Sequence, residues 1–318
     1  MNTTTDLASN SLSRPIILDC DPGHDDALAM LLALARPELR LLGITTVGGN
    51  ATLENTTRNA LSVLTILGRT DVPVAAGAAS PLSRRLETAP HVHGSSGLEG
   101  ADLPAPQMSV IEDEAVDFIA RIVSDSDAPI TLVPTGPLTN IALFRSRYPE
   151  LFARIHEIVL MGGSLGEGNI TPFAEFNIWV DPEAAAEVMA GGRPVSMMGL
   201  DVTHQALFSL DDTDRLEQLG TRTAIAFAGL LRFFGRFHAN KYGWSGAPIH
   251  DAVAVAHLLR DGLVTTQRHG ISVSTSDDTR GQTSGIPVDD EADGVDVGMS
   301  IDRLRFVDML IDAVALFP

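Results

Sequence analysis

Four aspartates occur within a short run near the start of the chain, and their spacing could serve metal or acid–base chemistry. Asp19, Asp21, Asp25 and Asp26 directly follow an apolar segment. Carboxylates held within a few ångströms of one another repel and raise each other's pKa. A hard dication removes that cost, and calcium takes roughly six to eight oxygen ligands from carboxylates, carbonyls and water. The cluster therefore predicts a divalent cation site of the kind that calcium occupies.

Two other interpretations of this segment remain open from the residues alone. Asp25 or Asp26 could do no more than cap the helix that follows. A strand followed by Asp-x-Asp also opens phosphatases of the haloacid dehalogenase type, in which the first aspartate is the nucleophile. Those enzymes need a phosphate-binding lysine, and the only lysine here, Lys241, lies far downstream in a helical segment. We keep the phosphatase as the less favoured alternative.

The composition restricts the partners and the compartment. The net charge of −19 argues against a nucleic-acid partner, because phosphate backbones repel an acidic surface. No apolar run approaches the roughly 18 residues of a membrane span, so we expect no membrane partner. The single cysteine, Cys20, excludes an internal disulfide and fits a reducing cytoplasm. Residues 1–14 are rich in Ser, Thr and Asn, so we expect a disordered tail and not a signal peptide.

The elements that must position these residues alternate between two patterns. Apolar runs predict strands at 15–18, 39–47, 72–76, 130–133, 158–161 and 194–200, with shorter pieces at 270–275 and 294–301. Helical periodicity predicts helices at 27–35, over about 18 residues up to Gly68, and at 112–124, 137–155, 182–190, 222–240, 251–260 and 302–317. The alternation predicts a single α/β domain, residues 15–318, with a mostly parallel central sheet flanked by helices.

The carboxyl ends of the predicted strands carry most of the polar candidates. In open α/β sheets, ligands bind in the crevice beyond these ends. The aspartate cluster follows the first strand, Asn50 follows the second, and Thr135 and Asp201 follow two later strands. We therefore expect these side chains to meet at one edge of the sheet.

The segment Asp19-Cys20-Asp21-Pro22-Gly23-His24-Asp25-Asp26 closely resembles the D-x-D-P-G-x-D-D signature of the nucleoside hydrolase family. Further segments resemble the family in the same order, namely residues 44–50, 91–94, 133–140, 161–163, 169–177, 181–185, 199–204, 250–251 and 279–281. The similarity extends from Ile16 to the last helix. It implies the fold of that family, with a Rossmann-like core.

The resemblance implies a metal site and two catalytic residues. Calcium would be held by Asp21, Asp26, the backbone carbonyl of Thr135 and Asp251, with water or the ribose 2′- and 3′-hydroxyls filling the remaining sites. Asp21 would also be the general base that takes a proton from the attacking water. His250 would assist the leaving base as a proton donor. The implied reaction splits the N-glycosidic bond of a ribonucleoside into base and ribose through an oxocarbenium-like transition state.

The resemblance also assigns residues to substrate binding, namely Asp25, Asn50, His93, Asn169, Glu175 and Asn177. All except His93 would bind the ribose hydroxyls, and His93 would line the pocket for the base or the ribose. Taken alone, Asn50 could cap a helix, and Asn169 and Asn177 could be turn residues. Because such a site is built to bind hydroxyl groups, 2′-deoxynucleosides should be poor substrates.

Base preference and assembly follow from the resemblance only in outline. The Gly-His-Asp-Asp form of the signature and His250 favour uridine and cytidine, with inosine as the next candidate. Tyr242 and Trp244 could stack on the base or simply pack against neighbouring side chains.

Family members are commonly homodimers or homotetramers, so a homo-oligomer is implied. The competing class is a non-catalytic nucleoside- or ribose-binding protein, which could lose Asp21 or the metal ligands, and both are complete here.

Overall fold

The computed structural model describes residues 13–259, 262–289 and 293–318. Residues 1–12 of the predicted disordered tail lie outside the described residues, and Arg14 already belongs to the first strand. None of the described helices is both long and apolar enough to cross a membrane.

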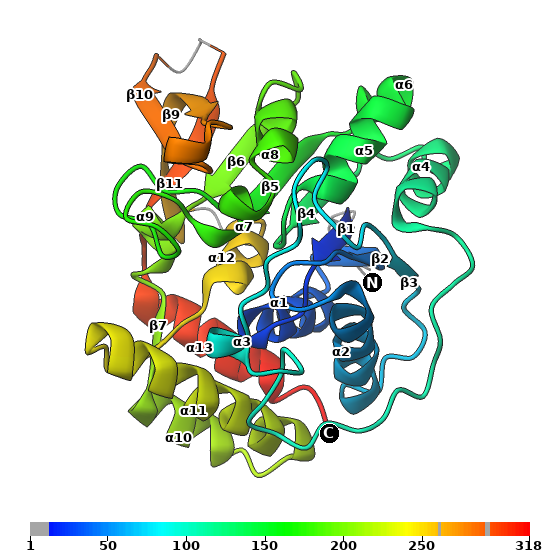
Figure 1. Cartoon of the computed structure of the whole chain (residues 1–318). Coiled ribbons are helices and arrows are strands. Elements are labelled where there is room, and N and C mark those ends of the chain that lie inside the picture. The colour runs from blue at the N-terminus through cyan, green and yellow to red at the C-terminus, as the bar shows by residue number, and fades with distance from the viewer. Residues whose placement is uncertain (1–12, 260–261, 290–292) are drawn as a thin grey trace, which may run out of the picture.

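Within the described residues, a nine-stranded sheet forms the centre of the molecule (Figure 1). Its order is β10 (Thr283–Pro287), β9 (Val264–Val273), β11 (Val295–Ile301), β6 (Val195–Met198), β5 (Glu157–Met161), β4 (Thr131–Pro134), β1 (Arg14–Cys20), β2 (Leu39–Thr46) and β3 (Val74–Ala76). Neighbouring strands from β11 to β3 pair in parallel, and β9 is antiparallel to both of its neighbours. The mostly parallel sheet predicted from the alternating pattern is therefore confirmed.

The strand order reverses between β1 and β4. From β1 the chain adds β2 and β3 on one side, and it then returns to place β4, β5 and β6 on the other side. The two loops that leave β1 and β4 therefore diverge and open a crevice between them. This switch point is where open α/β sheets bind their ligands.

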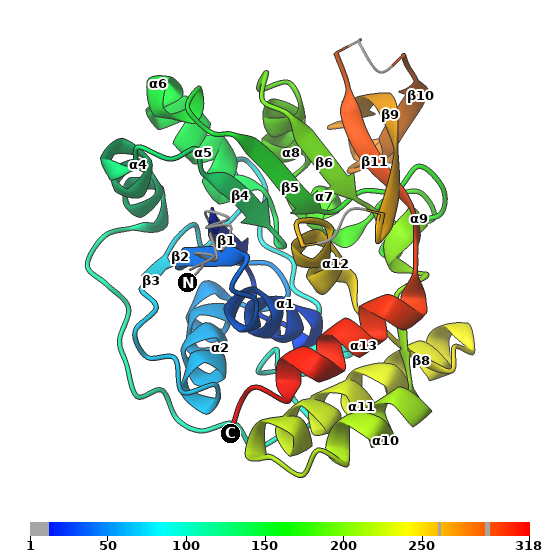
Figure 2. The ribbon, with the colours of Figure 1, turned by 180° about the vertical axis from the view of Figure 1, so that it is seen from behind.

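Helices cover both faces of the sheet (Figures 1 and 2). Successive side chains of a strand point to opposite faces, so Ile16 and Leu18 pack into one core and Ile17 into the other. The first core is closed by α1 (His24–Ala35), α2 (Leu53–Ile66), α10 (Leu210–Glu217), α11 (Arg222–Tyr242), α12 (His250–His257) and α13 (Arg303–Val314). The second is closed by α4 (Ala115–Asp125), α5 (Thr139–Arg147), α6 (Pro149–Phe152) and α8 (Pro182–Met189).

Several element boundaries differ from the predicted ones. The helix predicted at 137–155 is split into α5 and α6, because Pro149 disfavours helical backbone at Tyr148, which has φ −131° and ψ 60°. The strand predicted at 270–275 is part of the longer β9. The prediction missed the first half of β9, because that half is mostly polar and exposed and contains no apolar run. The short elements α3 (Pro90–His93), α7 (Phe176–Val180), α9 (Leu200–Thr203), β7 (Leu207–Ser209), β8 (Gly246–Pro248) and β10 were not predicted, because a few residues carry no clear periodicity.

Candidate active site

The predicted site residues gather at the switch point between β1 and β4. The loop after β1 leads into α1, whose first turn carries Asp25 and Asp26. Helix α12 packs against α1 and begins with His250 and Asp251. Packing of these two helix N-termini brings together two segments that are far apart in the sequence.

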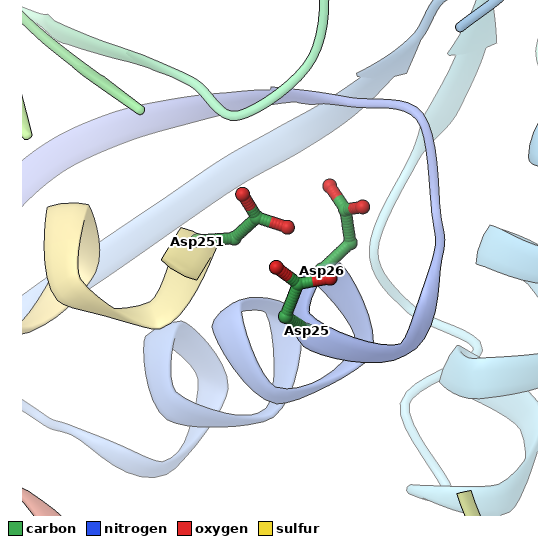
Figure 3. A group of neighbouring side chains, drawn as sticks. All are labelled: Asp25, Asp26 and Asp251. Carbon is green, nitrogen blue, oxygen red and sulfur yellow. The ribbon is translucent and has the colours of Figure 1, made fainter. Parts of the chain in front are cut away.

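Three carboxylates face one another where the two helices begin (Figure 3). Oxygen atoms of Asp25, Asp26 and Asp251 lie within 4.8 Å of one another, and all three side chains are buried. Burial raises the pKa of each, to about 7 for Asp25, and neighbouring carboxylates raise the pKa of Asp25 and Asp251 further. The resemblance assigned Asp25 to the ribose, and the structure places its carboxylate in the same cluster as two predicted metal ligands.

Asp21 lies beside this cluster, with one carboxylate oxygen anchored and the other without a partner. Its Oδ2 accepts the backbone N–H of Asn50 at 2.6 Å. Its Oδ1 is buried and has no hydrogen-bond partner among the described residues. Burial raises the pKa of Asp21, and the charge of Asp26 raises it further. A buried carboxylate oxygen without a partner fits a cation ligand or a proton acceptor.

Asp26 connects the start of α1 to the end of β4. Its Oδ2 accepts the backbone N–H of Gly23, the N-cap residue, at 2.9 Å. Its Oδ1 accepts the hydroxyl of Thr135 at 2.8 Å. The capping interpretation thus holds for one oxygen of Asp26 only. The carbonyl oxygen of Thr135 accepts a hydrogen bond from Nδ2 of Asn177 at 2.8 Å. A carbonyl oxygen has two lone pairs, so the second one is available for a cation.

The cluster borders a cavity whose empty space, counted together with its open mouth, is about 690 Å³. All predicted site residues except Asp21 and Asp26 line this cavity, namely Asp25, Asn50, His93, Thr135, Asn169, Glu175, Asn177, His250 and Asp251. Asp21 and Asp26 are each hydrogen-bonded to a lining residue, Asn50 and Thr135. The structure therefore brings the whole predicted set together.

Asn50, which follows β2, does not cap a helix, and Asn169 leaves a side-chain oxygen available in the cavity. Helix α2 is preceded by Thr52 as its N-cap residue, so Asn50 does not cap it. Asn50 Nδ2 instead donates to the carbonyl of Asp21 at 3.3 Å and to Asp26 Oδ2 at 3.4 Å. Oδ1 of Asn169 is buried and has no partner among the described residues, so it is available to a ligand hydroxyl.

Glu175 has a structural role that the sequence did not reveal. It is the N-cap residue of α7, and its Oε1 accepts the N–H of Asn177 at 2.8 Å. Its Oε2 accepts the N–H groups of Gly163 at 3.0 Å and Ile178 at 3.1 Å. Burial nevertheless raises the pKa of Glu175 to about 7. If Glu175 binds the ribose, it does so with a carboxylate that already accepts the backbone N–H groups that order the loop after β5.

Histidines line another part of the cavity wall. Burial lowers the pKa of His93, His238 and His250, and His250 Nδ1 lies 2.7 Å from the hydroxyl of Thr203. His238 was not predicted as a site residue. Its ring stacks on Tyr242, with ring centroids 5.9 Å apart. The spacing of His238 and Tyr242, which places them on one face of α11, is the sequence signal that could have found it.

Asp19 is not among the side chains that line the cavity. Its Oδ1 accepts the Thr45 hydroxyl at 2.5 Å and Asn140 Nδ2 at 2.7 Å, and burial raises its pKa to about 7. Lys241 donates to the carbonyl of Asn169. A phosphatase nucleophile has to face its substrate, so the haloacid dehalogenase interpretation has no support in this geometry.

The sequence profile described as "Inosine-uridine preferring nucleoside hydrolase" matches residues 16–308. The chain is 49% identical over 315 residues to the pyrimidine-specific ribonucleoside hydrolase RihA of a Shewanella species, covering 96% of this chain and 98% of that protein. It is 46% identical over 314 residues to the RihA of an Escherichia coli strain, covering 96% and 100%. A purine-preferring ribonucleoside hydrolase from Gardnerella vaginalis is similar in structure, with a TM-score of 0.90 and 34% identity, covering 95% of this chain and 98% of that one. The chain therefore belongs to the inosine-uridine preferring nucleoside hydrolase family.

Proposed function

We propose that this enzyme hydrolyses pyrimidine ribonucleosides, uridine and cytidine before inosine, to the free base and ribose. The observation that carries the proposal is the carboxylate cluster beside the buried Oδ1 of Asp21, which has no partner among the described residues, at a cavity lined by the predicted substrate-binding residues. The preference for pyrimidines is supported by the similarity to two pyrimidine-specific hydrolases along almost the whole chain.

The residues at the cluster fit a calcium ion. They offer only hard oxygen donors, which would be the carboxylates of Asp21, Asp26 and Asp251 and the carbonyl of Thr135, and Asp25 lies close to them. A bound calcium ion would neutralise the cluster, bind the two ribose hydroxyls and lower the pKa of a water molecule. The buried Oδ1 of Asp21, which has no partner among the described residues, is the independent sign that this set is built for a ligand.

Asp21 is the proposed general base. The backbone N–H of Asn50 holds its Oδ2, so the plane of the carboxylate is restrained and Oδ1 is left to accept a proton. Burial raises the pKa of this group, which makes its ionised form a stronger base. The proton would come from the water that attacks the anomeric carbon of the ribose.

His250 is the proposed partner of the leaving base. When the Thr203 hydroxyl donates to Nδ1, the neutral ring carries its hydrogen on Nε2 and can offer it to the base as a hydrogen bond. Full proton transfer to the base needs the protonated ring, which carries a hydrogen on each nitrogen and becomes neutral when Nε2 loses its proton. Burial lowers the pKa of His250, so the free ring is neutral. The negative charge that develops on a departing pyrimidine stabilises the protonated ring. It therefore raises the pKa of His250 and opposes the lowering that burial causes.

The assay that tests the proposed reaction measures reducing sugar released from uridine, cytidine, inosine, adenosine and guanosine. We expect the highest kcat/KM for uridine and cytidine. Removing calcium with EGTA should lower the rate by about 100-fold or more. Calcium should restore it where magnesium does not, because magnesium demands near-ideal octahedral geometry and gives up its water reluctantly, whereas calcium accepts irregular sets of oxygen ligands. No ribose from any nucleoside at micromolar enzyme would favour the non-catalytic binding protein, and an unchanged rate in EGTA would refute the calcium assignment.

Replacing His250 by Ala should lower kcat for uridine by about 100-fold, because a poor leaving group loses its proton donor. The same variant should hydrolyse p-nitrophenyl β-D-ribofuranoside at nearly the wild-type rate, because nitrophenolate leaves without a proton. His156→Ala, at an exposed histidine before β5, is the matched control and should leave both rates unchanged. An equal loss on both substrates would show that His250 does not act on the leaving group.

We also propose that the enzyme is a homodimer or homotetramer of the cytoplasm. The assembly is inferred from the family resemblance alone. The buried, unpaired thiol of Cys20 is compatible with a reducing compartment.

A further inference from the structure

His24 occupies one of the two variable positions of the aspartate signature, and it lies buried behind His93 and Phe234, which line the cavity. Its ring stacks against the rings of His93, Phe233 and Phe234 at centroid distances of 5.2, 5.3 and 5.2 Å. Its Nε2 lies 2.7 Å from the backbone oxygen of Glu99. Its Nδ1 lies 3.0 Å from Nδ1 of His93, which lines the cavity.

These two contacts determine where the hydrogens of both rings lie. A carbonyl oxygen can only accept, so His24 Nε2 carries a hydrogen and donates it to Glu99. Both rings are buried and stack on Phe234, and neither has a carboxylate among its hydrogen-bond partners in the described residues. A buried positive charge without such a partner is costly, so each ring is neutral and has one N–H. His24 Nδ1 is then an acceptor, and the hydrogen between the rings belongs to His93 Nδ1. The remaining nitrogen of His93, Nε2, has a free lone pair.

We propose that His24 is a positioning residue that sets the tautomer of His93, so that Nε2 of His93 acts as a hydrogen-bond acceptor toward the nucleoside. The relay runs from the Glu99 carbonyl through His24 to His93 and ends in the cavity. Its ligand would be a donor group of the substrate, and the candidates on uridine are the 5′-hydroxyl and the N3–H of the base. The identity of the ligand rests on the proposed function, whereas the tautomer of His93 is a property of the protein alone.

A purely structural role for His24 makes a different demand on the side chain. Packing between two phenylalanines requires an aromatic ring, which Phe would also supply. The relay requires a donor on one side of the ring and an acceptor on the other, which Phe lacks. His24→Phe therefore separates the two roles, because it keeps the ring and removes both nitrogens.

The tautomer can be measured without any substrate. In a two-bond proton–nitrogen correlation spectrum of protein labelled at histidine nitrogens, we expect His93 to be protonated on Nδ1 and unprotonated on Nε2, with its signals assigned from the spectrum of His93→Phe. In His24→Phe, the His93 signals should shift toward the Nε2–H form. A hydrogen on Nε2 of His93 in the wild-type protein would overturn the proposal even if the enzyme hydrolyses nucleosides as proposed.

Kinetics test whether the acceptor is used. His24→Phe should raise KM for uridine about tenfold with a much smaller change in kcat, because a donor of the bound substrate loses its partner. Either 5′-deoxyuridine or 3-methyluridine, whichever lacks that donor, should show the same KM with both proteins. The double variant His24→Phe/His93→Phe should be no worse than His93→Phe alone, since His24 acts through His93. Independent, additive losses in a variant that keeps the wild-type Tm would show that His24 only packs.

Discussion

Asp21→Asn is expected to lower kcat for uridine by about 10³- to 10⁴-fold while the protein remains folded and binds calcium more weakly. The amide oxygen of Asn can still accept the N–H of Asn50 that now holds Oδ2, so the side chain should keep its orientation. Its amide nitrogen then occupies the place of Oδ1, the buried oxygen that has no partner in the described part of the chain. That nitrogen has no lone pair to accept a proton from water, so the general base is lost.

The measurement is ribose release under saturating uridine, together with the rise in Tm when calcium is added. Asp181→Asn is the matched control, because Asp181 is also a buried aspartate that accepts backbone N–H groups, from Leu82 and Ala184, but it caps α8 away from the cavity. It should lower Tm and leave kcat within about twofold. Full activity in Asp21→Asn would refute the assignment of Asp21 as the base, and loss of the calcium-induced rise in Tm would assign it to metal binding instead.

A second large effect is expected from the substrate. The kcat/KM for 2′-deoxyuridine should be about 10⁴-fold below that for uridine, because a site built to bind hydroxyl groups leaves buried polar atoms unpaired when the hydroxyl is missing. The atoms at stake include Oδ1 of Asn169, which has no partner among the described residues. The buried carboxylates around them also favour positive charge on the ribose ring over a neutral sugar.

This discrimination should arise at the sugar and not at the base. The matched comparison is p-nitrophenyl β-D-ribofuranoside with its 2-deoxy analogue, which changes the leaving group and keeps the same difference in the sugar. We expect a similar ratio of kcat/KM for the two pairs. If 2′-deoxyuridine were hydrolysed within about tenfold of uridine, the hydroxyl contacts would contribute little, and the assignment of Asn169 would be wrong.

Much of the fold was predictable because its signals are local. The apolar runs of β1 and β5 are buried on both faces, as central parallel strands require, and helical periodicity located α11 and α13. The split of α5 from α6 depends on a single proline. The order of the strands cannot be obtained in this way, since it depends on which neighbours each strand finds after packing.

The sequence by itself determined which residues are candidates for the chemistry of this protein: a run of aspartates after a strand, in a signature that resembles the nucleoside hydrolases, with an asparagine, a threonine and a His-Asp pair downstream. Only the tertiary structure decided which of those residues come into contact at the site. The reversal of strand order at β1 and β4 places Thr135 against Asp26, and the packing of α12 on α1 brings Asp251 to the cluster. The hydrogen bond between His24 and His93 likewise depends on α1 and α3, which meet only in the folded chain. Residue types and their periodicity are properties of short segments, whereas ligand sets and tautomers depend on contacts between segments far apart in the sequence.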